Sequence, residues 1–232
     1  MEYKSARYIV FCRVLGFLIK TTCYIAILAL MSLSTYTFYD GIAVNREPDG
    51  IRQLRGQISD SAEAFVWPDE MVAWLKIDGT HIDYPVMQGG DNKWYLTHDY
   101  LGREAMSGSV FLDYRNRQDF SDDLSIIYGH RMNNDLMFSD VAKFADAEYF
   151  EEHRNGLLKT PNGEYELRVV VHNILSAEDN AYEEVSGASL GLGSGKYLLL
   201  STCNRSGRMK RDVLIMEIKK RPNGLICESG GV

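Results

Sequence analysis

LLLSTC, at Leu198–Cys203, is an apolar run that ends on a cysteine. A second run, IIYGH at Ile126–His130, ends on a histidine in the same way, and Arg211 stands directly before a third apolar run, 212–218. If the three runs are neighbouring strands, a thiol, an imidazole and a guanidinium meet at one edge of a sheet. That set is sufficient for nucleophilic acyl chemistry, because a thiolate attacks carbonyl carbon and an imidazole moves protons.

The region after Pro68 consists of short β-rich runs separated by turn residues such as Asn162-Gly163. Several short strands at this spacing indicate an antiparallel sandwich or a closed barrel, so we predict a mostly β fold. The predicted strands span 72–77, 81–87, 109–114, 124–130, 156–160, 165–175, 196–202 and 212–219.

One interval departs from this β pattern. Between residues 137 and 153 the apolar side chains recur at helical spacing, and Asp146 is a candidate N-cap of a second helical segment. The sequence therefore predicts a helical insertion directly after the strand that ends at His130. The apolar positions are Val141, Phe144, Ala145 and Tyr149.

The N-terminal region contains TTCYIAILALMSLSTYTF, Thr21–Phe38, a stretch without a charged residue. About 18 such residues are enough to cross a bilayer as a helix. Four basic residues precede the stretch, and the first charge after it is Asp40. Because positive charge stays on the cytoplasmic side, we predict a cytoplasmic segment over 1–20, a membrane anchor over 21–38 and the remainder outside the cell.

Two other interpretations of this stretch remain open. A cleaved signal peptide needs a small-x-small site, for which Gly41–Ala43 is a poor candidate. A buried core helix rarely stands at an extreme N-terminus behind several basic residues. Beyond the anchor we expect a juxtamembrane linker with helical turns over 39–66, a main domain over 67–220 and a flexible C-terminal tail over 221–232.

Charge and cysteine usage exclude several classes of function. The chain has a net charge of −7, and the predicted outer part is more acidic still, which disfavours a nucleic-acid partner. Cys12 and Cys23 fall in or beside the membrane segment, whereas Cys203 and Cys227 lie outside it and could form one disulfide. No C-x-x-C or H-E-x-x-H spacing occurs, so we expect no metal site and no other cofactor.

Each candidate catalytic residue also has a structural interpretation. Cys203 could be a small buried hydrophobe, but the polar stretch after it favours an exposed edge, and nearby arginines favour the thiolate. His130 could be a structural histidine, although Gly129 before it suggests a close backbone approach or a bend, either of which suits the wall of a pocket. Arg211 could donate hydrogen bonds to an oxyanion, and Arg208 competes with it for that role.

These motifs together resemble the three signatures of sortases, the membrane-anchored cysteine transpeptidases of Gram-positive bacteria. Tyr128–His130, Leu200–Cys203 and Arg211 occur in the family's order, and the likeness extends from about Trp67 to Lys219. The helical insertion after the histidine strand is similar to class B. Further stretches that resemble class B are Ile82–Val86, Tyr95–Asp99, Gly108–Asp113 and Met137–Asp140.

The resemblance implies a closed eight-stranded β-barrel and a transpeptidation reaction. It implies that Cys203 attacks a Thr–Gly-type or Thr–Asn-type bond in a C-terminal sorting signal and forms a thioester. An amine of a cell-wall precursor or a pilin lysine would resolve that thioester, with His130 moving protons and Arg211 binding the oxyanion. Ser201 and Thr202 are implied to line the substrate groove, and Arg208 remains a substrate-binding candidate.

One residue departs from the family pattern. Asp212 follows Arg211 where an apolar residue is more usual, so it could pair with that arginine and weaken its role.

Two other functions remain as alternatives. The first is a cysteine peptidase that releases the acyl group to water, although papain-like enzymes place Cys before His and the flanking pattern of caspases is absent around Cys203. The second is a non-catalytic, membrane-tethered binding domain in which Cys203 and Cys227 are oxidised together.

Overall fold

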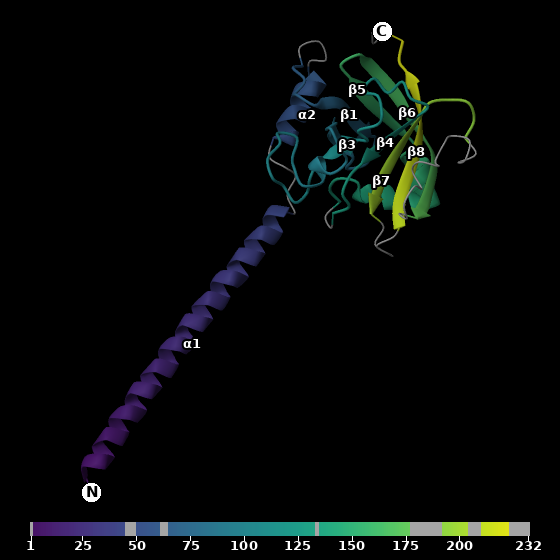
Figure 1. Cartoon of the computed structure of the whole chain (residues 1–232). Coiled ribbons are helices and arrows are strands. Elements are labelled where there is room, and N and C mark those ends of the chain that lie inside the picture. The colour runs from purple at the N-terminus through teal and green to yellow at the C-terminus, as the bar shows by residue number, and fades with distance from the viewer. Residues whose placement is uncertain are drawn as a thin grey trace, which may run out of the picture. The chain divides into compact units, whose positions relative to one another are not determined.

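A computed structural model of the chain describes residues 2–44, 50–60, 65–132, 135–176, 192–203 and 210–222. The chain divides into two compact units, Met1–Arg46 and Glu47–Val232. The first unit contains the helix α1, Glu2–Val44, and the second contains all the strands (Figure 1). The predicted C-terminal tail lies outside the described residues from position 223 onward.

Helix α1 is long and apolar enough to cross a membrane. Its apolar window runs from Val10 to Phe38 with a mean hydropathy of 2.0, and it includes the predicted 21–38 segment. Hydroxyl side chains within the window donate to carbonyl oxygens one turn earlier, as Thr22 does to Leu18 at 3.0 Å. This satisfies their polar groups inside the helix, which an apolar environment requires. By length and composition alone, both a membrane anchor and a signal sequence fit this helix.

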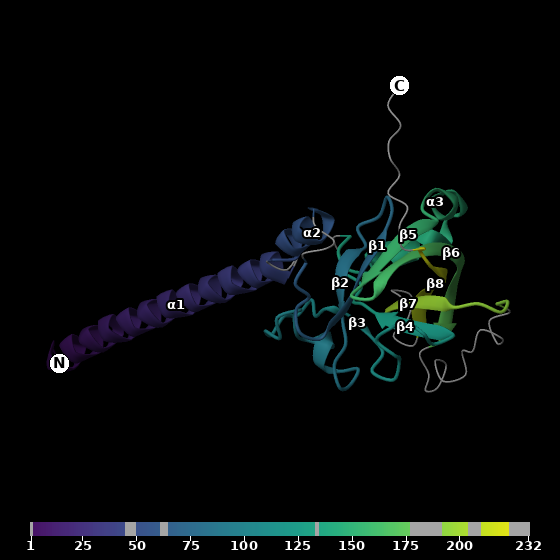
Figure 2. The same ribbon diagram turned by 90° about the horizontal axis from the view of Figure 1, so that it is seen from above.

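The second unit is built on a closed barrel of eight strands. The order around the barrel is β1-β2-β3-β4-β7-β8-β6-β5, and Figure 2 shows the strands arranged as a ring. The closed eight-stranded barrel expected from the resemblance is therefore confirmed. The strands are β1 Met71–Ile77, β2 Asp83–Met87, β3 Val110–Leu112, β4 Leu124–Tyr128, β5 Asn155–Thr160, β6 Gly163–Ser176, β7 Tyr197–Cys203 and β8 Lys210–Lys220.

The pairing within the barrel is mixed rather than wholly antiparallel. β2 pairs with β3, and β4 pairs with β7, in parallel, whereas the remaining pairs are antiparallel. Two parallel neighbouring strands need a long crossover connection between them. For β4 and β7, the helical insertion, β5 and β6 form this connection. As a consequence, the carboxyl ends of β4 and β7 and the beginning of β8 lie at the same rim.

Two apolar clusters explain why consecutive residues of β7 are apolar. Leu198 and Leu200 belong to the large cluster that fills the barrel, whereas Leu199 packs in a smaller cluster on the outer face. Strands buried on both faces are apolar throughout instead of alternating. The smaller cluster consists of Ile126, Tyr197, Leu199, Val213 and Ile215.

Four short helical elements complete the described part of the second unit. The predicted helical insertion is present as a 3₁₀ segment, η2 Ser139–Ala145, and a short helix, α3 Ala147–Glu152. Asp146 caps α3 as predicted, because its side chain accepts a hydrogen bond from the backbone N–H of Tyr149 at 2.9 Å. The other elements are α2, Ile51–Asp60, whose Ile51 and Ile58 are buried in the barrel cluster, and η1, Trp94–Leu96.

Asp140 attaches the helical insertion to the connection between β1 and β2. Its buried carboxylate accepts from the backbone N–H of His81 at 2.7 Å and forms an ion pair with Lys143 at 2.7 Å. Burial acts to raise the pKa of Asp140, but the hydrogen bonds from His81 and Lys143 outweigh it, so the pKa lies below its ordinary value. The ionised carboxylate therefore stabilises the folded protein.

We expect Asp140→Asn to lower the free energy of unfolding by about 2–3 kcal/mol, the usual worth of hydrogen bonds to a buried charge. Asp135→Asn is the matched control, because its exposed carboxylate pairs with the same lysine at 3.0 Å and surface pairs contribute less than about 1 kcal/mol. The contribution of Asp140 is fully present above its unfolded pKa, and it is lost as the pH falls through the lower folded pKa. Denaturant unfolding of both variants at pH 7 and pH 3 measures this, and equal losses in the two variants would contradict it.

Candidate active site

The three motifs predicted to converge lie on adjacent strands at one rim of the barrel. β7 stands between β4 and β8 in the strand order. Cys203, the last residue of β7, is the direct partner of Arg211 on β8, and Tyr128, the last residue of β4, is the partner of Ser201. His130 follows Tyr128 by two residues, as Cys203 follows Ser201, and the Gly129 N–H donates to the Ser201 carbonyl at 3.2 Å. The register thus aligns the backbones of all three motifs.

Strand alternation assigns these residues to a face of the barrel. Leu199 and Val213 belong to the outer cluster, so Ser201, Cys203 and Arg211 share the outer face with them. Thr202 lies on the opposite, inner face and is 1% exposed. Of the two groove-lining residues implied by the resemblance, only Ser201 is therefore on the face of Cys203. Cys203 is described by its backbone alone, and Arg208 and Cys227 lie outside the described residues.

The ring of His130 is oriented by the backbone of η1. Its Nε2 lies 2.9 Å from the carbonyl oxygen of Leu96. Because a carbonyl oxygen only accepts, Nε2 carries the hydrogen, and Nδ1 is the nitrogen left to exchange a proton. The His130 carbonyl in turn accepts from the Phe138 N–H at 3.0 Å, so the backbone and the ring are each held by another segment.

Gly129 lets the ring of Phe138 pack directly on the backbone before His130. A Cβ placed at Gly129 would lie 2.6 Å from Cδ2 of Phe138, closer than real Cβ contacts allow. Phe138 is fully buried and packs in the barrel cluster. The close backbone approach predicted for Gly129 is confirmed.

Gly129→Ala is expected to lower stability by about 1–3 kcal/mol through overpacking. It is also expected to lower activity by about tenfold or more, because the strain is relieved by moving the adjacent His130. Gly90→Ala is the matched control, since a Cβ at Gly90 meets nothing within 4 Å. Thermal unfolding and the turnover assay described below measure both effects, and an unchanged alanine variant at position 129 would refute the packing argument.

A buried carboxylate fixes the side chain of Tyr128 beside the site. Asp113 accepts hydrogen bonds from the Tyr128 hydroxyl at 2.9 Å and from the Asn92 amide at 2.9 Å, and it pairs with Arg115 at 2.9 Å. Burial acts to raise the pKa of Asp113, but the hydrogen bonds, the largest from Arg115, hold it below the ordinary value. Asp113 is therefore an ionised anchor for the end of β4.

A second buried carboxylate lies on the inner face under the rim. Asp212 accepts from Nη1 of Arg131 at 2.9 Å, and Nε2 of His172 lies 3.7 Å from its other oxygen. Burial lowers the pKa of His172 despite the nearby carboxylate, so this histidine is neutral at neutral pH. The carboxylate of Asp212 is thus directed to the inner face, whereas Arg211 belongs to the outer face.

Sequence reasoning missed two features of this site. The Leu96 carbonyl that orients His130 comes from a segment far away in the sequence, and no side-chain motif marks a backbone acceptor. The Arg131–Asp212 pair did leave a signal, because a basic residue directly follows His130 and an acidic residue directly follows Arg211.

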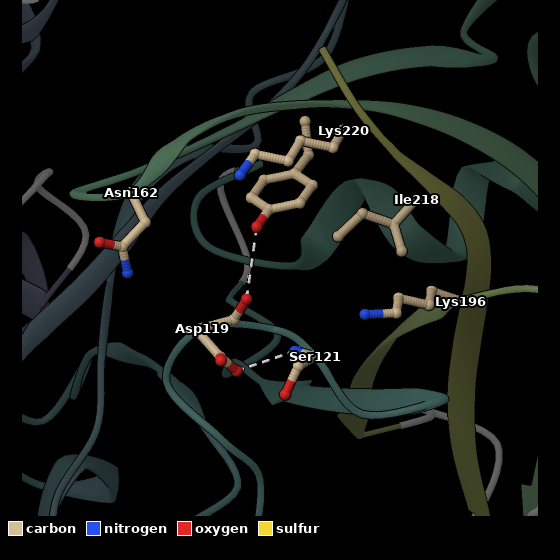
Figure 3. A pocket seen from close by; sticks show the side chains of 7 residues that line it. Asp119, Ser121, Asn162, Lys196, Ile218 and Lys220 are labelled. Carbon is tan, nitrogen blue, oxygen red and sulfur yellow. Dashed lines mark hydrogen bonds between the residues drawn. The ribbon is translucent and has the colours of Figure 1, made fainter. Parts of the chain in front are cut away.

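A separate recess lies at the other end of β7. It has a volume of about 470 Å³, and Figure 3 shows Lys196, Lys220 and Asp119 around it. Lys196 precedes the first residue of β7, so roughly 20 Å of strand separates this recess from Cys203. The recess is therefore not part of the candidate active site.

Comparison with known proteins agrees with this description. The sortase domain family matches residues 75–217. Sortase B of Listeria monocytogenes is 41% identical over 131 residues, covering 56% of this chain and 53% of that protein. Sortase B of Staphylococcus aureus is 31% identical over 111 residues, covering 48% and 46%. A solved Streptococcus pyogenes class B sortase involved in pilus biogenesis has a TM-score of 0.60 at 27% identity, covering 72% of this chain and 98% of that one.

The fold and the site define a closed β-barrel protein whose rim aligns a cysteine, a histidine and an arginine. The family match covers more than half of the chain, and the chain belongs to the sortase family. Each of the three relatives is a class B sortase, as the resemblance predicted. The matched regions span about half the length of the Listeria and Staphylococcus proteins.

Proposed function

We propose that this protein is a membrane-anchored cysteine transpeptidase that joins sorting-signal proteins to an amine acceptor. The observation that carries the proposal is that Cys203 and Arg211 are direct partners on β7 and β8, while His130 follows the end of the adjacent strand β4 by two residues. Membership of a family of cysteine transpeptidases supports it independently.

The first half of the reaction forms a thioester. The Cys203 thiolate bonds to the carbonyl carbon of the threonine in a Thr–Gly-type or Thr–Asn-type bond. The carbon–nitrogen bond then breaks, and His130 donates a proton to the departing amine. Arg211 donates hydrogen bonds to the oxyanion that exists between these two events, and Arg208 is the competing donor. Nδ1 of His130 is the nitrogen available for the proton transfer, because Nε2 donates to the Leu96 carbonyl.

The second half transfers the acyl group. The acceptor amine gives a proton to His130, its nitrogen bonds to the thioester carbon, and the carbon–sulfur bond breaks to restore the thiolate. The position of Ser201 on the face that carries Cys203 supports a role in lining the substrate groove. The position of Thr202 on the opposite, inner face supports a packing role rather than substrate contact.

The acceptor is a cell-wall precursor or a pilin lysine. A class B sortase involved in pilus biogenesis shares the fold at 27% identity, which supports the pilin acceptor. Both acceptors present a primary amine, and the same deprotonation by His130 activates each of them.

Helix α1 would anchor the enzyme with its N-terminus in the cytoplasm. The length and composition of the Val10–Phe38 window support a single membrane crossing. Basic residues before the window and an acidic residue after it support this orientation, with the barrel outside the cell.

The proposed function is tested by incubating the full chain in detergent with a library of peptides that contain Thr–Gly or Thr–Asn bonds. Triglycine serves as the amine acceptor, and mass spectrometry separates the ligated product from the hydrolysed one. A ligated product is the expected result. Hydrolysis alone in the presence of the acceptor would favour the peptidase alternative, and absence of any cleavage would favour the binding-domain alternative.

A further inference from the structure

We propose that the ion pair between Arg131 and Asp212 is a positioning device for the candidate active site. The pair lies on the inner face of the barrel, and it holds His130 and Arg211 in place on either side of Cys203. This inference rests on the proposed function, in which those two residues act on the substrate, whereas Arg131 and Asp212 act only through their neighbours.

The first argument is the position of the two charges in the chain. Arg131 directly follows His130, and Asp212 directly follows Arg211. Nη1 of Arg131 lies 2.9 Å from Oδ2 of Asp212, although the two residues are 81 positions apart. A bond between these side chains therefore fixes the two backbone positions that carry the proposed proton carrier and oxyanion donor.

The second argument is the strand order. Arg131 lies beyond the end of β4, Asp212 lies at the beginning of β8, and β7 with Cys203 at its end stands between them. Two strand spacings separate β4 from β8, about 10 Å, which an arginine and an aspartate span together. Because Asp212 is the direct partner of Thr202, the pair connects the two strands that flank Cys203.

The third argument is burial. The side chain of Asp212 is 3% exposed and that of Arg131 is 19% exposed, so water competes little for this bond. His172 on β6 lies 3.7 Å from Asp212, and its neutral ring adds no charge to the ion pair between Arg131 and Asp212. A buried, charge-assisted bond holds its partners in one geometry more firmly than a surface pair does.

The experiment compares Arg131→Gln, Asp212→Asn and the double variant of the full chain, with kcat and KM measured separately in the transpeptidation assay. A displacement of about 1 Å at a reacting group can cost about a hundredfold in rate. We therefore expect each single variant to lose between about ten and a hundredfold in kcat, with KM for the peptide changed less than about threefold. The double variant is expected to lose no more than the worse single variant, because both substitutions break one bond. Arg131→Lys is expected to recover part of the loss.

The matched control is Arg55→Gln, which breaks an ion pair of similar geometry on α2, with Nε of Arg55 3.0 Å from Asp83. We expect this control to lower the melting temperature and to leave kcat unchanged. A loss of melting temperature with unchanged kcat in the Arg131 and Asp212 variants would overturn the proposal. So would a double variant whose loss equals the product of the two single losses.

A second readout does not depend on any peptide substrate. Iodoacetamide alkylation of Cys203, followed site by site with mass spectrometry over a range of pH, reports how His130 and Arg211 influence the thiol. We expect the alkylation profile of Cys203 to shift in both single variants and to stay unchanged in Arg55→Gln. If wild-type protein turns over no peptide, the proposed function fails, and the alkylation profile still decides whether the ion pair positions the rim. An unchanged profile in both single variants would overturn the positioning role.

Discussion

Cys203→Ala is expected to abolish both cleavage and transfer of sorting-signal peptides. Removing the nucleophile from a catalytic set costs on the order of 10⁶-fold in kcat, and removing its proton carrier alone costs about as much. His130→Ala is therefore expected to reach a similar residual rate, and the two losses should not add in the double variant. The measurement is kcat for peptide ligation to triglycine, with each variant checked by thermal unfolding.

Cysteine variants elsewhere in the chain provide the control. Cys12→Ala and Cys23→Ala alter the exposed thiols of α1, and both are expected to keep wild-type turnover. Cys227→Ala tests the oxidised alternative, because a disulfide with Cys203 would make its removal activating. Measurable turnover in Cys203→Ala, or in His130→Ala, would contradict the catalytic assignment.

Arg211→Ala is expected to lower kcat by about 10²–10³-fold, which corresponds to roughly 2.7–4 kcal/mol of transition-state stabilisation from one oxyanion donor. The strand register supports Arg211, since it is the direct partner of Cys203 on the same face. Arg208→Ala is expected to change kcat/KM through substrate binding and to leave kcat close to wild type.

Lys210→Ala is the matched control for the loss of a cation beside Arg211. Lys210 is an exposed residue at the beginning of β8, and its removal is expected to change kcat less than about twofold. If Arg208→Ala loses the hundredfold and Arg211→Ala does not, the oxyanion role belongs to Arg208 and the argument from register is wrong.

Much of the barrel was predictable from sequence because each strand carries a local signal. Apolar runs such as Leu198–Leu200, bounded by turn residues, predicted eight strands, and the part of the chain that the structure describes contains eight. The parallel pairing of β4 with β7 was not predictable from these runs. It depends on a crossover that contains η2, α3, β5 and β6, and the sequence of a strand does not show which other strand it pairs with.

The candidate site was predictable to the extent that it follows the ends of strands. The sequence predicted that three motifs meet at one rim of the barrel, and the strand register aligns them there. Two of the motifs end at His130 and Cys203, and the third begins at Arg211. The contact of His130 with the Leu96 carbonyl joins distant segments, and no local pattern marks it. The Arg131–Asp212 pair also joins distant segments, so the charges that follow His130 and Arg211 in the sequence do not by themselves show that they meet. Alternation along β7 places Ser201 and Thr202 on opposite faces of the barrel, but only the structure shows which of these faces is the outer one.

The most direct test of a cysteine transpeptidase is capture of the thioester itself. The full chain is mixed with a cleavable sorting-signal peptide without an acceptor, quenched in acid, and its intact mass and proteolytic fragments are measured. The account predicts one acyl adduct that maps to Cys203 and disappears when triglycine is added, with the ligated peptide formed in equal amount. Turnover without any adduct on Cys203, or an adduct on another residue that triglycine consumes, would contradict it.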